Sequence, residues 1–250
     1  MEKYTLTRKS VADVADGTKM FVFTKPVGFD FKAGQYVALE VKEFSVEDDG
    51  KGKLRSLSIA SAPYEDELHF VMRQGESSFK RTIWALQAGD TVLSTKPVGA
   101  FVLPEDGDET PVVFLIGGVG ITPARSMLRQ AMHLSSQRQF FLFYSNRLLK
   151  DAAFHEEMKA MPTEHFTYVN TLTQTDTVCG VGEERGYICK AMIEKYVANP
   201  LSMRYYIVGS PDFSTAMKGV VVSLGVAEGD IHMDSFTGLR SPKKTEALAQ

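Results

Sequence analysis

The stretch VVFLIGGVGITPARSML, from Val112 to Leu128, decides the fold of this chain. An apolar run stops at Gly117, Gly118 and Gly120, and a helix-like pattern follows. Glycine lets the backbone turn sharply with positive φ, and it lets a ligand come close to the main chain. The helix start behind the glycines offers unpaired N–H groups and a positive dipole end, which favour phosphate. The order of strand, glycine loop and helix therefore favours a site for a phosphorylated ligand.

The residues after the glycines fit the start of a helix. Thr122 and Pro123 both suit a first helical turn. The motif is not a complete GxGxxG, because Pro123 stands where a third glycine would stand. A tight strand-to-helix turn without a ligand is the alternative interpretation, and the stretch by itself leaves both open.

Strand and helix patterns alternate after an acidic, turn-rich linker at residues 104–111. Such alternation predicts a doubly wound parallel sheet. Strands are expected at VVFLIG, QFFLFYS, HFTYVNTL and RYYIVGS, and helices at PARSMLRQAMHL, DAAFHEEMKAM, GYICKAMIEKYV and DFSTAMKGVVVSLG. Ligands bind beyond the carboxyl ends of the strands in such sheets. The site is therefore predicted to draw on residues 117–123, 144–147, 171–173 and 209–211.

Short strand patterns fill the first hundred residues. KMFVFTKP, QYVALEVKEF, RSLSIASA, ELHFVMRQ and DTVLSTKP carry β-branched and aromatic residues between turn signals. Their regular spacing predicts a small antiparallel β-barrel. One helix is expected within residues 78–87, and the polar, glycine-rich residues 47–53 predict an exposed hairpin loop. We therefore expect two domains, 1–106 and 107–250.

Composition and charge exclude several classes of protein. The 250 residues carry a formal net charge of −3 with a pI near 6.0, which gives no reason to expect nucleic acid or an anionic membrane as a partner. There is no apolar run of membrane-spanning length, and the first residues lack a signal-peptide pattern, so a soluble, cytoplasmic protein is expected. Two cysteines and five histidines form no metal-spaced cluster, and no metal site is predicted.

Two motifs in the first half carry possible chemistry. In RSLS, Arg55 is either a solvent-facing strand residue or the partner of a phosphate, and Ser58 offers a hydroxyl to a ring nitrogen. In FVMRQGESS, a strand ends near Arg73 and a helix follows, which Ser77 or Ser78 can cap. That helix start is either an ordinary cap or a pyrophosphate site.

The motifs occur together in one order: GQYVALEV, RSLS, GESS, AGDTV, GGVGITP, YSNR and VGSPDF. In this order and spacing the chain resembles the ferredoxin–NADP reductase superfamily of flavin oxidoreductases, from about Tyr4 to Gly238. The resemblance implies an N-terminal antiparallel β-barrel that binds FAD, followed by a doubly wound α/β domain that binds NADPH or NADH.

The resemblance also implies roles in the barrel. The family's RxYS motif reads Arg55-Ser56-Leu57-Ser58, so Arg55 would contact the FAD phosphates and Ser58 would lie near flavin N5. Leu57 stands where the family usually has a Tyr stacked on the flavin, and a leucine cannot stack as a ring does. Ser78 matches the serine of the family's GxxS/T element and would bind the pyrophosphate.

In the second half the implied site follows the strand ends. Thr122 would lie near the nicotinamide. Ser145 and Arg147 could bind a 2′-phosphate, which favours NADP, although Arg147 could instead pair with Asp151. In VGSPDF, Val208 replaces the usual Cys. Asp234 belongs to a segment resembling the family's terminal ExFxG, and it is either a group near the nicotinamide or a surface carboxylate.

These motifs define the predicted site. The catalytic candidates are Ser58, Thr122 and Asp234, and the cofactor-binding candidates are Arg55, Ser56, Leu57, Ser58, Met72, Arg73, Gly75, Ser77, Ser78, Gly117, Gly118, Gly120, Thr122, Pro123, Ser145, Arg147, Gly209, Ser210 and Phe236.

The predicted activity is hydride transfer from NAD(P)H to flavin N5, followed by electron transfer to a separate acceptor. A ferredoxin, a flavodoxin or the iron–sulfur protein of an oxygenase is the expected partner. A flavin-carrying subunit of a larger complex and a degenerate nucleotide-binding regulatory module are the alternatives.

Overall fold

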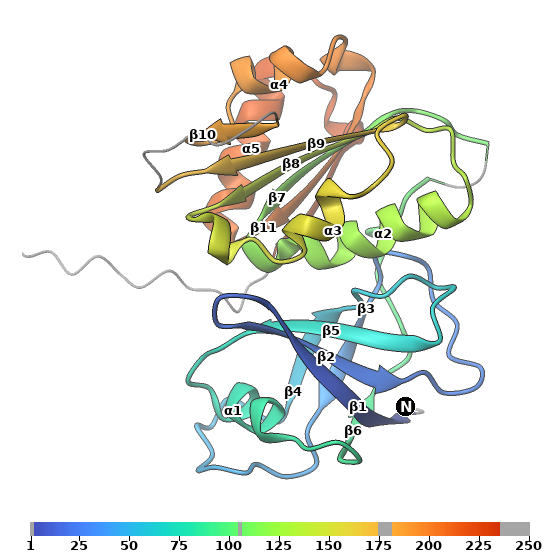
Figure 1. Cartoon of the computed structure of the whole chain (residues 1–250), viewed down its shortest axis with the longest axis vertical. Coiled ribbons are helices and arrows are strands. Elements are labelled where there is room, and N and C mark those ends of the chain that lie inside the picture. The colour runs from blue at the N-terminus through green and yellow to red at the C-terminus, as the bar shows by residue number, and fades with distance from the viewer. Residues whose placement is uncertain (1–2, 105–106, 175–181, 236–250) are drawn as a thin grey trace, which may run out of the picture.

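Two six-stranded sheets make up the computed structural model, which describes residues 3–104, 107–174 and 182–235 (Figure 1). The first sheet is antiparallel, with the strand order β4-β3-β6-β1-β2-β5. Its strands are β1 (Tyr4–Ala15), β2 (Thr18–Thr24), β3 (Tyr36–Glu40), β4 (Leu54–Ser58), β5 (Glu67–Arg73) and β6 (Thr91–Ser94).

The two end strands of the first sheet come together just beyond β4. The amide of Ala60 donates to the carbonyl of His69 on β5 at 2.8 Å, so the sheet closes on itself. The enclosed core contains Phe21, Phe23 and Phe70, together with Phe79 from the helix α1 (Ser78–Ala85). The predicted antiparallel barrel with one helix is confirmed.

The longest strand of the barrel, β1, was not predicted. Of its twelve residues only Leu6 is fully buried, and charged residues interrupt the alternation that marks a strand. It forms because it pairs with β6 at its start and with β2 over the rest of its length. Tertiary pairing here outweighs a weak local pattern.

The second sheet is wholly parallel, in the order β10-β9-β8-β7-β11-β12. Its strands are β7 (Val112–Gly117), β8 (Phe140–Asn146), β9 (Phe166–Leu172), β10 (Glu183–Arg185), β11 (Arg204–Gly209) and β12 (Ile231–Ser235). The strand order reverses at β7, whose neighbours are β8 and β11. A ligand crevice is expected at the carboxyl ends of β7 and β11, where the connections diverge.

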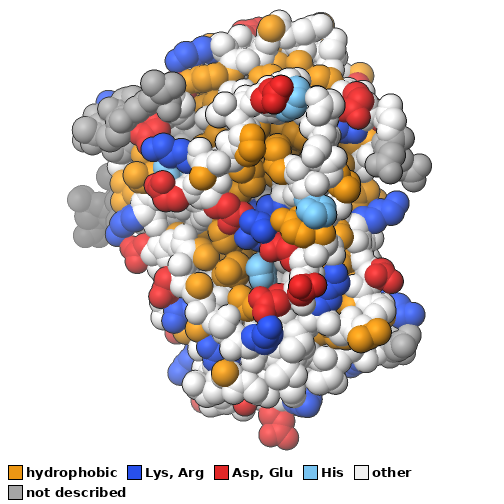
Figure 2. Space-filling model, turned by 45° about the vertical axis from the view of Figure 1, so that its right-hand side comes forward, with side chains coloured by type: hydrophobic (Ala, Val, Ile, Leu, Met, Phe, Trp, Pro, Cys, Tyr) orange, Lys and Arg blue, Asp and Glu red, His pale blue; other side chains and the backbone are white. Residues whose placement is uncertain are grey.

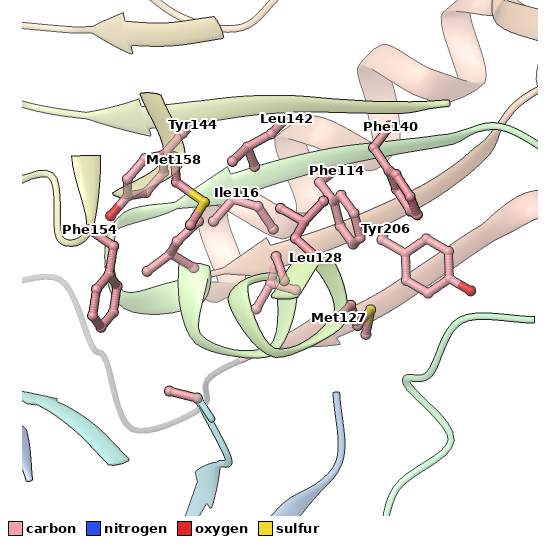
Figure 3. Close-up of a cluster of buried hydrophobic side chains, with 14 of the residues drawn as sticks. Phe114, Ile116, Met127, Leu128, Phe140, Leu142, Tyr144, Phe154, Met158 and Tyr206 are labelled. Atoms are coloured by element: carbon pink, nitrogen blue, oxygen red, sulfur yellow. The ribbon is translucent and has the colours of Figure 1, made fainter. Parts of the chain in front are cut away.

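Helices cover both faces of this sheet, which confirms the doubly wound architecture. The helices α2 (Ile121–His133) and α3 (His155–Lys159) lie on the face toward the barrel, and α4 (Lys190–Tyr196) and α5 (Pro211–Leu224) cover the other face (Figure 1). Side chains of β7, β8 and β11 point toward α2 and fill the space beneath it (Figure 3). Single 3-10 turns occur at η1 (Gly118–Gly120), η2 (Leu149–Asp151), η3 (Pro200–Ser202) and η4 (Glu228–Asp230).

Some predicted boundaries differ from the structure. The helix expected from Asp151 begins only at His155, because Phe154 has a φ of 59° in the left-handed region. The strands β10 and β12 lack a predicted counterpart. Residues 105–106 lie outside the described part of the chain, so the boundary between residues 106 and 107 stays a prediction.

A substitution at Gly34 can test the contact between the barrel and α2. Its φ is +98°, and a Cβ there would overlap the carbonyl oxygen of Phe101 and the terminal methyl of Met127 on α2. We expect Gly34→Ala to lower the free energy of unfolding by about 3 kcal/mol, from backbone strain plus overpacking.

Gly28→Ala is the matched control, because Gly28 has a φ of +75° and a Cβ there would meet nothing. It should cost only about 1 kcal/mol in urea denaturation, from the left-handed backbone. Equal losses in the two variants would contradict the close approach at Gly34.

Candidate functional site

The glycines around β7 have different physical roles. A Cβ on Gly120 would lie 2.7 Å from the carbonyl oxygen of Val208, and Cβ atoms on Gly117 and Gly209 would lie 3.0 and 2.5 Å from the ring of Phe213. These three glycines therefore let α2, β11 and Phe213 pack closely. Gly118 differs from them, because it has a φ of +52° and a Cβ there would meet nothing. Gly118 is the member of this set that faces open space at the start of α2.

Thr122 and Pro123 support the glycine loop from inside. Thr122 is 3% exposed, and its hydroxyl donates to the carbonyl of Val119 at 3.1 Å. Pro123 is also buried in the first turn of α2. The expected approach of Thr122 to nicotinamide stays a prediction; in this conformation its hydroxyl is bonded within its own helix start. Val119 on η1 is only half-buried.

A second helix begins beside the first. Ser210 caps α5 by accepting a hydrogen bond from the amide of Phe213 at 3.3 Å, with Pro211 at the first helical position. The carboxyl ends of β7 and β11 thus carry two adjacent helix N-termini. The structure brings the predicted coenzyme residues Gly117, Gly118, Gly209 and Ser210 together at these strand ends.

The flavin motif lies on β4. Ser58 is 7% exposed, Leu57 packs partly on the barrel core, and Ser56 faces solvent. Arg55 donates to the carbonyls of Lys51, Gly52 and Leu54 at 2.7–3.1 Å. The guanidinium of Arg55 is therefore bonded to its own loop.

The serine side chains at the start of α1 also have hydrogen-bond partners within the chain. Ser77 caps the helix by accepting from the amide of Lys80 at 3.3 Å. Ser78 is 2% exposed, and its hydroxyl donates to the carbonyl of Glu47 at 2.6 Å and accepts from the amide of Asp49 at 2.8 Å. The role of Ser78 as a pyrophosphate ligand stays a prediction; in this conformation its hydroxyl is buried beneath the loop and bonded to it.

Hydrogen bonds across the seam between the domains join the flavin motif to the coenzyme loop. Ser126 on α2 donates to the carbonyl of Ser61 at 2.6 Å, and Arg125 donates to that of Ala60 at 2.6 Å. Arg125 and Ser126 are 4% and 0% exposed. Ala60 and Ser61 directly follow the β4 motif, and α2 directly follows the glycine loop, so these bonds hold the two motifs together.

Ion pairs reinforce this seam. Glu157 accepts from Arg125 and Arg129 at 3.0 Å each, and Arg129 also donates to Glu65 of the barrel at 3.1 Å. Charged and histidine side chains gather across the middle of the molecule (Figure 2). Sequence reasoning missed this seam, because its residues follow no motif and look like an ordinary helix surface.

A cavity of about 400 Å³ lies farther along the same seam, at the carboxyl end of β8. Asp151 in its wall lies 3.7 Å from Nη2 of Arg73 and 3.5 Å from Nε of Arg147. The pairing of Arg147 with Asp151, the alternative left open by the sequence, is present. Arg73 faces the second domain and shares this carboxylate with Arg147, while Met72 is buried in the barrel core.

Two buried amides lie on neighbouring strands of the parallel sheet. Asn146 ends β8 and Asn170 lies in the second half of β9; they are 5% and 1% exposed, and neither side-chain amide has a hydrogen-bond partner in the described ranges. Buried polar groups of this kind normally find a ligand or ordered water. No motif in the sequence marks these two asparagines.

Asp234 lies on β12, next to Val208 of β11. Burial raises the pKa of its carboxyl. Phe236 lies outside the described residues.

Comparisons with known proteins agree with this geometry. Residues 114–219 match the family model of the oxidoreductase NAD-binding domain. The glycine betaine monooxygenase reductase subunit of Chromohalobacter salexigens is 30% identical over 231 residues, which are 88% of this chain and 60% of that protein. The cytochrome P450 reductase GcoB of Amycolatopsis superposes with a TM-score of 0.78 at 25% identity, over 94% of this chain and 70% of that one.

A ferredoxin NADP+ reductase from Neisseria gonorrhoeae, solved with bound FAD and NADP, has the same fold, with a TM-score of 0.79 at 23% identity over 94% of this chain and 99% of that one. The chain therefore contains an oxidoreductase NAD-binding domain and has the two-domain fold of these reductases. It spans 51% to 60% of the length of three curated relatives that it matches.

Within residues 3–104, 107–174 and 182–235, no group of three or more His, Cys, Asp or Glu side chains could hold a metal ion. In the same ranges, none of the helices has the length and hydropathy needed to cross a bilayer.

Asp234 predicts a pH dependence of stability. Its pKa is raised in the folded state, so the native protein holds this proton more tightly than the unfolded chain does. The stabilising contribution is complete below the ordinary carboxyl range and is lost as pH rises through the raised pKa. Asp234→Asn has no carboxyl group to ionise, so it does not lose stability in this way as pH rises. Between about pH 4 and pH 7 the Tm of Asp234→Asn should therefore rise by ~2 °C relative to that of the wild type.

Thermal melts across this pH range measure the difference. Asp66→Asn, at an exposed carboxylate of the barrel, is the control. A Tm difference between Asp234→Asn and the wild type that stays constant with pH would contradict the raised pKa.

Proposed function

We propose that this chain is an FAD-dependent NAD(P)H oxidoreductase that passes electrons to a separate acceptor. The observation that carries this proposal is the seam, in which α2 behind the glycine loop is bonded to the chain directly behind the RSLS strand. An enzyme that transfers hydride between two bound cofactors needs this juxtaposition, because the reacting atoms must be held in contact.

The residues around the barrel helix suit a flavin diphosphate. Lys80 lies beside Gly75, where a Cβ would be 3.3 Å from its Nζ. Burial, aided by Arg73, lowers the pKa of Lys80, and no carboxylate of the described residues forms an ion pair with it. The carboxylate of Asp49 accepts from the first amide of α1 at 3.3 Å, so this helix start already holds an anion. The donor set therefore fits the group.

Each half of the site has a separate task in this proposal. Bound FAD would accept a hydride from the nicotinamide and release electrons one at a time. Arg55, Ser77 and Ser78 would hold the flavin, Ser58 would lie near its reactive ring, and Gly118 would leave room for the coenzyme. Asp234 would stand close to the nicotinamide as a proton donor.

A protein acceptor is the proposed partner. Two relatives are named as the reductase subunit or component of a monooxygenase, in the glycine betaine and propane 2-monooxygenase systems. We therefore favour an oxygenase component, a ferredoxin or a flavodoxin as the acceptor, in the cytoplasm.

Flavin reduction tests this function directly. The purified protein should bind FAD, absorb near about 450 nm and bleach when NADPH or NADH is added without oxygen. Gly118→Val should keep the flavin spectrum but be reduced at least about tenfold more slowly, because its side chain would fill the open space at a positive φ.

Each alternative gives a different result. A protein that stays colourless at high FAD concentration would contradict the proposal and leave a regulatory nucleotide-binding module. Reduction by the coenzyme without electron transfer to any acceptor would favour the flavin-carrying subunit of a larger complex.

The cavity at β8 predicts the preferred coenzyme. Arg147 and Arg73 converge there on one carboxylate, so two cations are available for a 2′-phosphate. We expect NADPH to be preferred, and Arg147→Gln to raise KM for NADPH about tenfold with little change in KM for NADH.

Lys218→Gln is the matched control, because Lys218 lies on the outer helix α5 and pairs with Glu228 of η4. Steady-state kinetics with both coenzymes measure the effect. An equal rise in both KM values for Arg147→Gln would exclude recognition of the 2′-phosphate.

A further inference from the structure

The loop between β3 and β4, residues 45–53, is folded back onto the start of α1. The amide of Ser45 donates to the hydroxyl of Thr82 at 3.0 Å, and the amide of Asp49 donates to the hydroxyl of Ser78 at 2.8 Å. The hydroxyl of Ser78 donates in turn to the carbonyl of Glu47 at 2.6 Å. The sequence predicts an exposed hairpin here, but the loop is bonded to the helix along one side.

One carboxylate of this loop occupies the helix start. Asp49 accepts from the amide of Ser78 at 3.3 Å and from the amide of Lys51 at 3.1 Å. The amide of Lys51, then that of Ser78, and the charges of Lys51 and Arg55 hold the pKa of Asp49 below its usual range. An ionised carboxylate at a helix N-terminus satisfies the free N–H groups as a phosphate would.

The same loop engages both groups that the sequence assigned to the flavin diphosphate. Arg55 donates to the carbonyls of Lys51 and Gly52, and Ser78 is bonded to Glu47 and Asp49. Lys80, by contrast, is a half-buried cation beside the same helix start that lacks an anionic partner in the described chain. Lys80 is therefore a cation at this helix start that Asp49 does not pair with.

We propose that residues 45–53 form a strap that closes the flavin diphosphate site, with Asp49 standing in for a phosphate, and that FAD binds by displacing it. This inference rests on the proposed flavin function and adds a property of this chain's own loop.

The loop can move because little of it is buried. Residues 47–53 are all exposed. Gly50 and Gly52 have φ values of +71° and +77° with open space around them. A diphosphate carries more charge and more acceptor oxygens than one carboxylate, so it is the stronger partner for the amides of α1, Arg55 and Lys80. Exchange of the strap for the cofactor is therefore favourable.

FAD titration monitored by flavin fluorescence tests the competition. Asp49→Ala should bind FAD about tenfold more tightly than the wild type, because the competing charged hydrogen-bond acceptor is gone. Asp49→Asn, which keeps the shape of the side chain, should shift affinity in the same direction. Asp48→Ala is the matched control: it removes the same charge from an exposed neighbour whose carboxylate, among the described residues, accepts only from the amide of Gly50.

Tryptic cleavage at Lys51 and Lys53 reports whether the strap is closed on α1 or displaced from it, and it needs no catalytic turnover. Added FAD should raise the rate of cleavage in the wild type several-fold, and Asp49→Ala without FAD should already be cleaved at the raised rate. Asp48→Ala without FAD should be cleaved like the wild type.

The outcomes separate the inference from the proposed function. Equal FAD affinity in the wild type, Asp49→Ala and Asp48→Ala, or protection of the loop by FAD, would overturn the strap while the flavoprotein function stands. Failure of the wild type and both Asp49 variants to bind FAD would overturn the strap and the proposed function together.

Discussion

Two hydrogen bonds from α2 to the chain behind β4 set the geometry of this molecule. Ser126 and Arg125 donate to the carbonyls of Ser61 and Ala60, and their side chains are almost fully buried. Loss of either donor would leave a buried carbonyl without a partner, which is costly. Arg125 is also held between Glu157 and the ring of Phe154, whose centroid lies 4.5 Å from the guanidinium carbon. Phe154, whose backbone is in the left-handed region, is thus in contact with a residue of the seam. The barrel cannot shift relative to the glycine loop without breaking several of these contacts together.

Glycine serves packing as much as ligand access in this site. Gly117, Gly120 and Gly209 let Phe213 and the carbonyl of Val208 approach the strand ends, and this brings two helix N-termini side by side. Gly118 takes the left-handed conformation next to open space. The glycine-rich loop therefore lets the strand ends and helix starts pack closely, and it leaves open space at Gly118.

Local patterns predicted most elements because burial leaves either an apolar run or a regular alternation in the sequence. β7 and β11 are buried on both faces, and their apolar runs are unmistakable. β1 was missed because pairing rather than burial defines it, and the helix expected from Asp151 starts late because Phe154 turns the chain. In the site, the positions of Gly118, Ser58 and Arg147 follow from the motifs. The engagement of Ser78 and Arg55 by the loop of residues 45–53 does not, because hydrogen bonds between distant segments leave no periodic trace.

The sequence by itself determined the order of a barrel and a parallel sheet, the strand ends where ligands gather, and the resemblance to flavin reductases. Those features depend on the spacing of apolar residues, glycines and helix caps, which is local information. Only the tertiary structure decided which side chains at the site already have hydrogen-bond or ion-pair partners within the chain. It turned Thr122 inward, paired Arg147 and Arg73 on Asp151, and placed Asp49 at the start of α1. The physical reason is that buried donors and charges must find partners wherever the folded chain brings them, and those partners lie far away in the sequence.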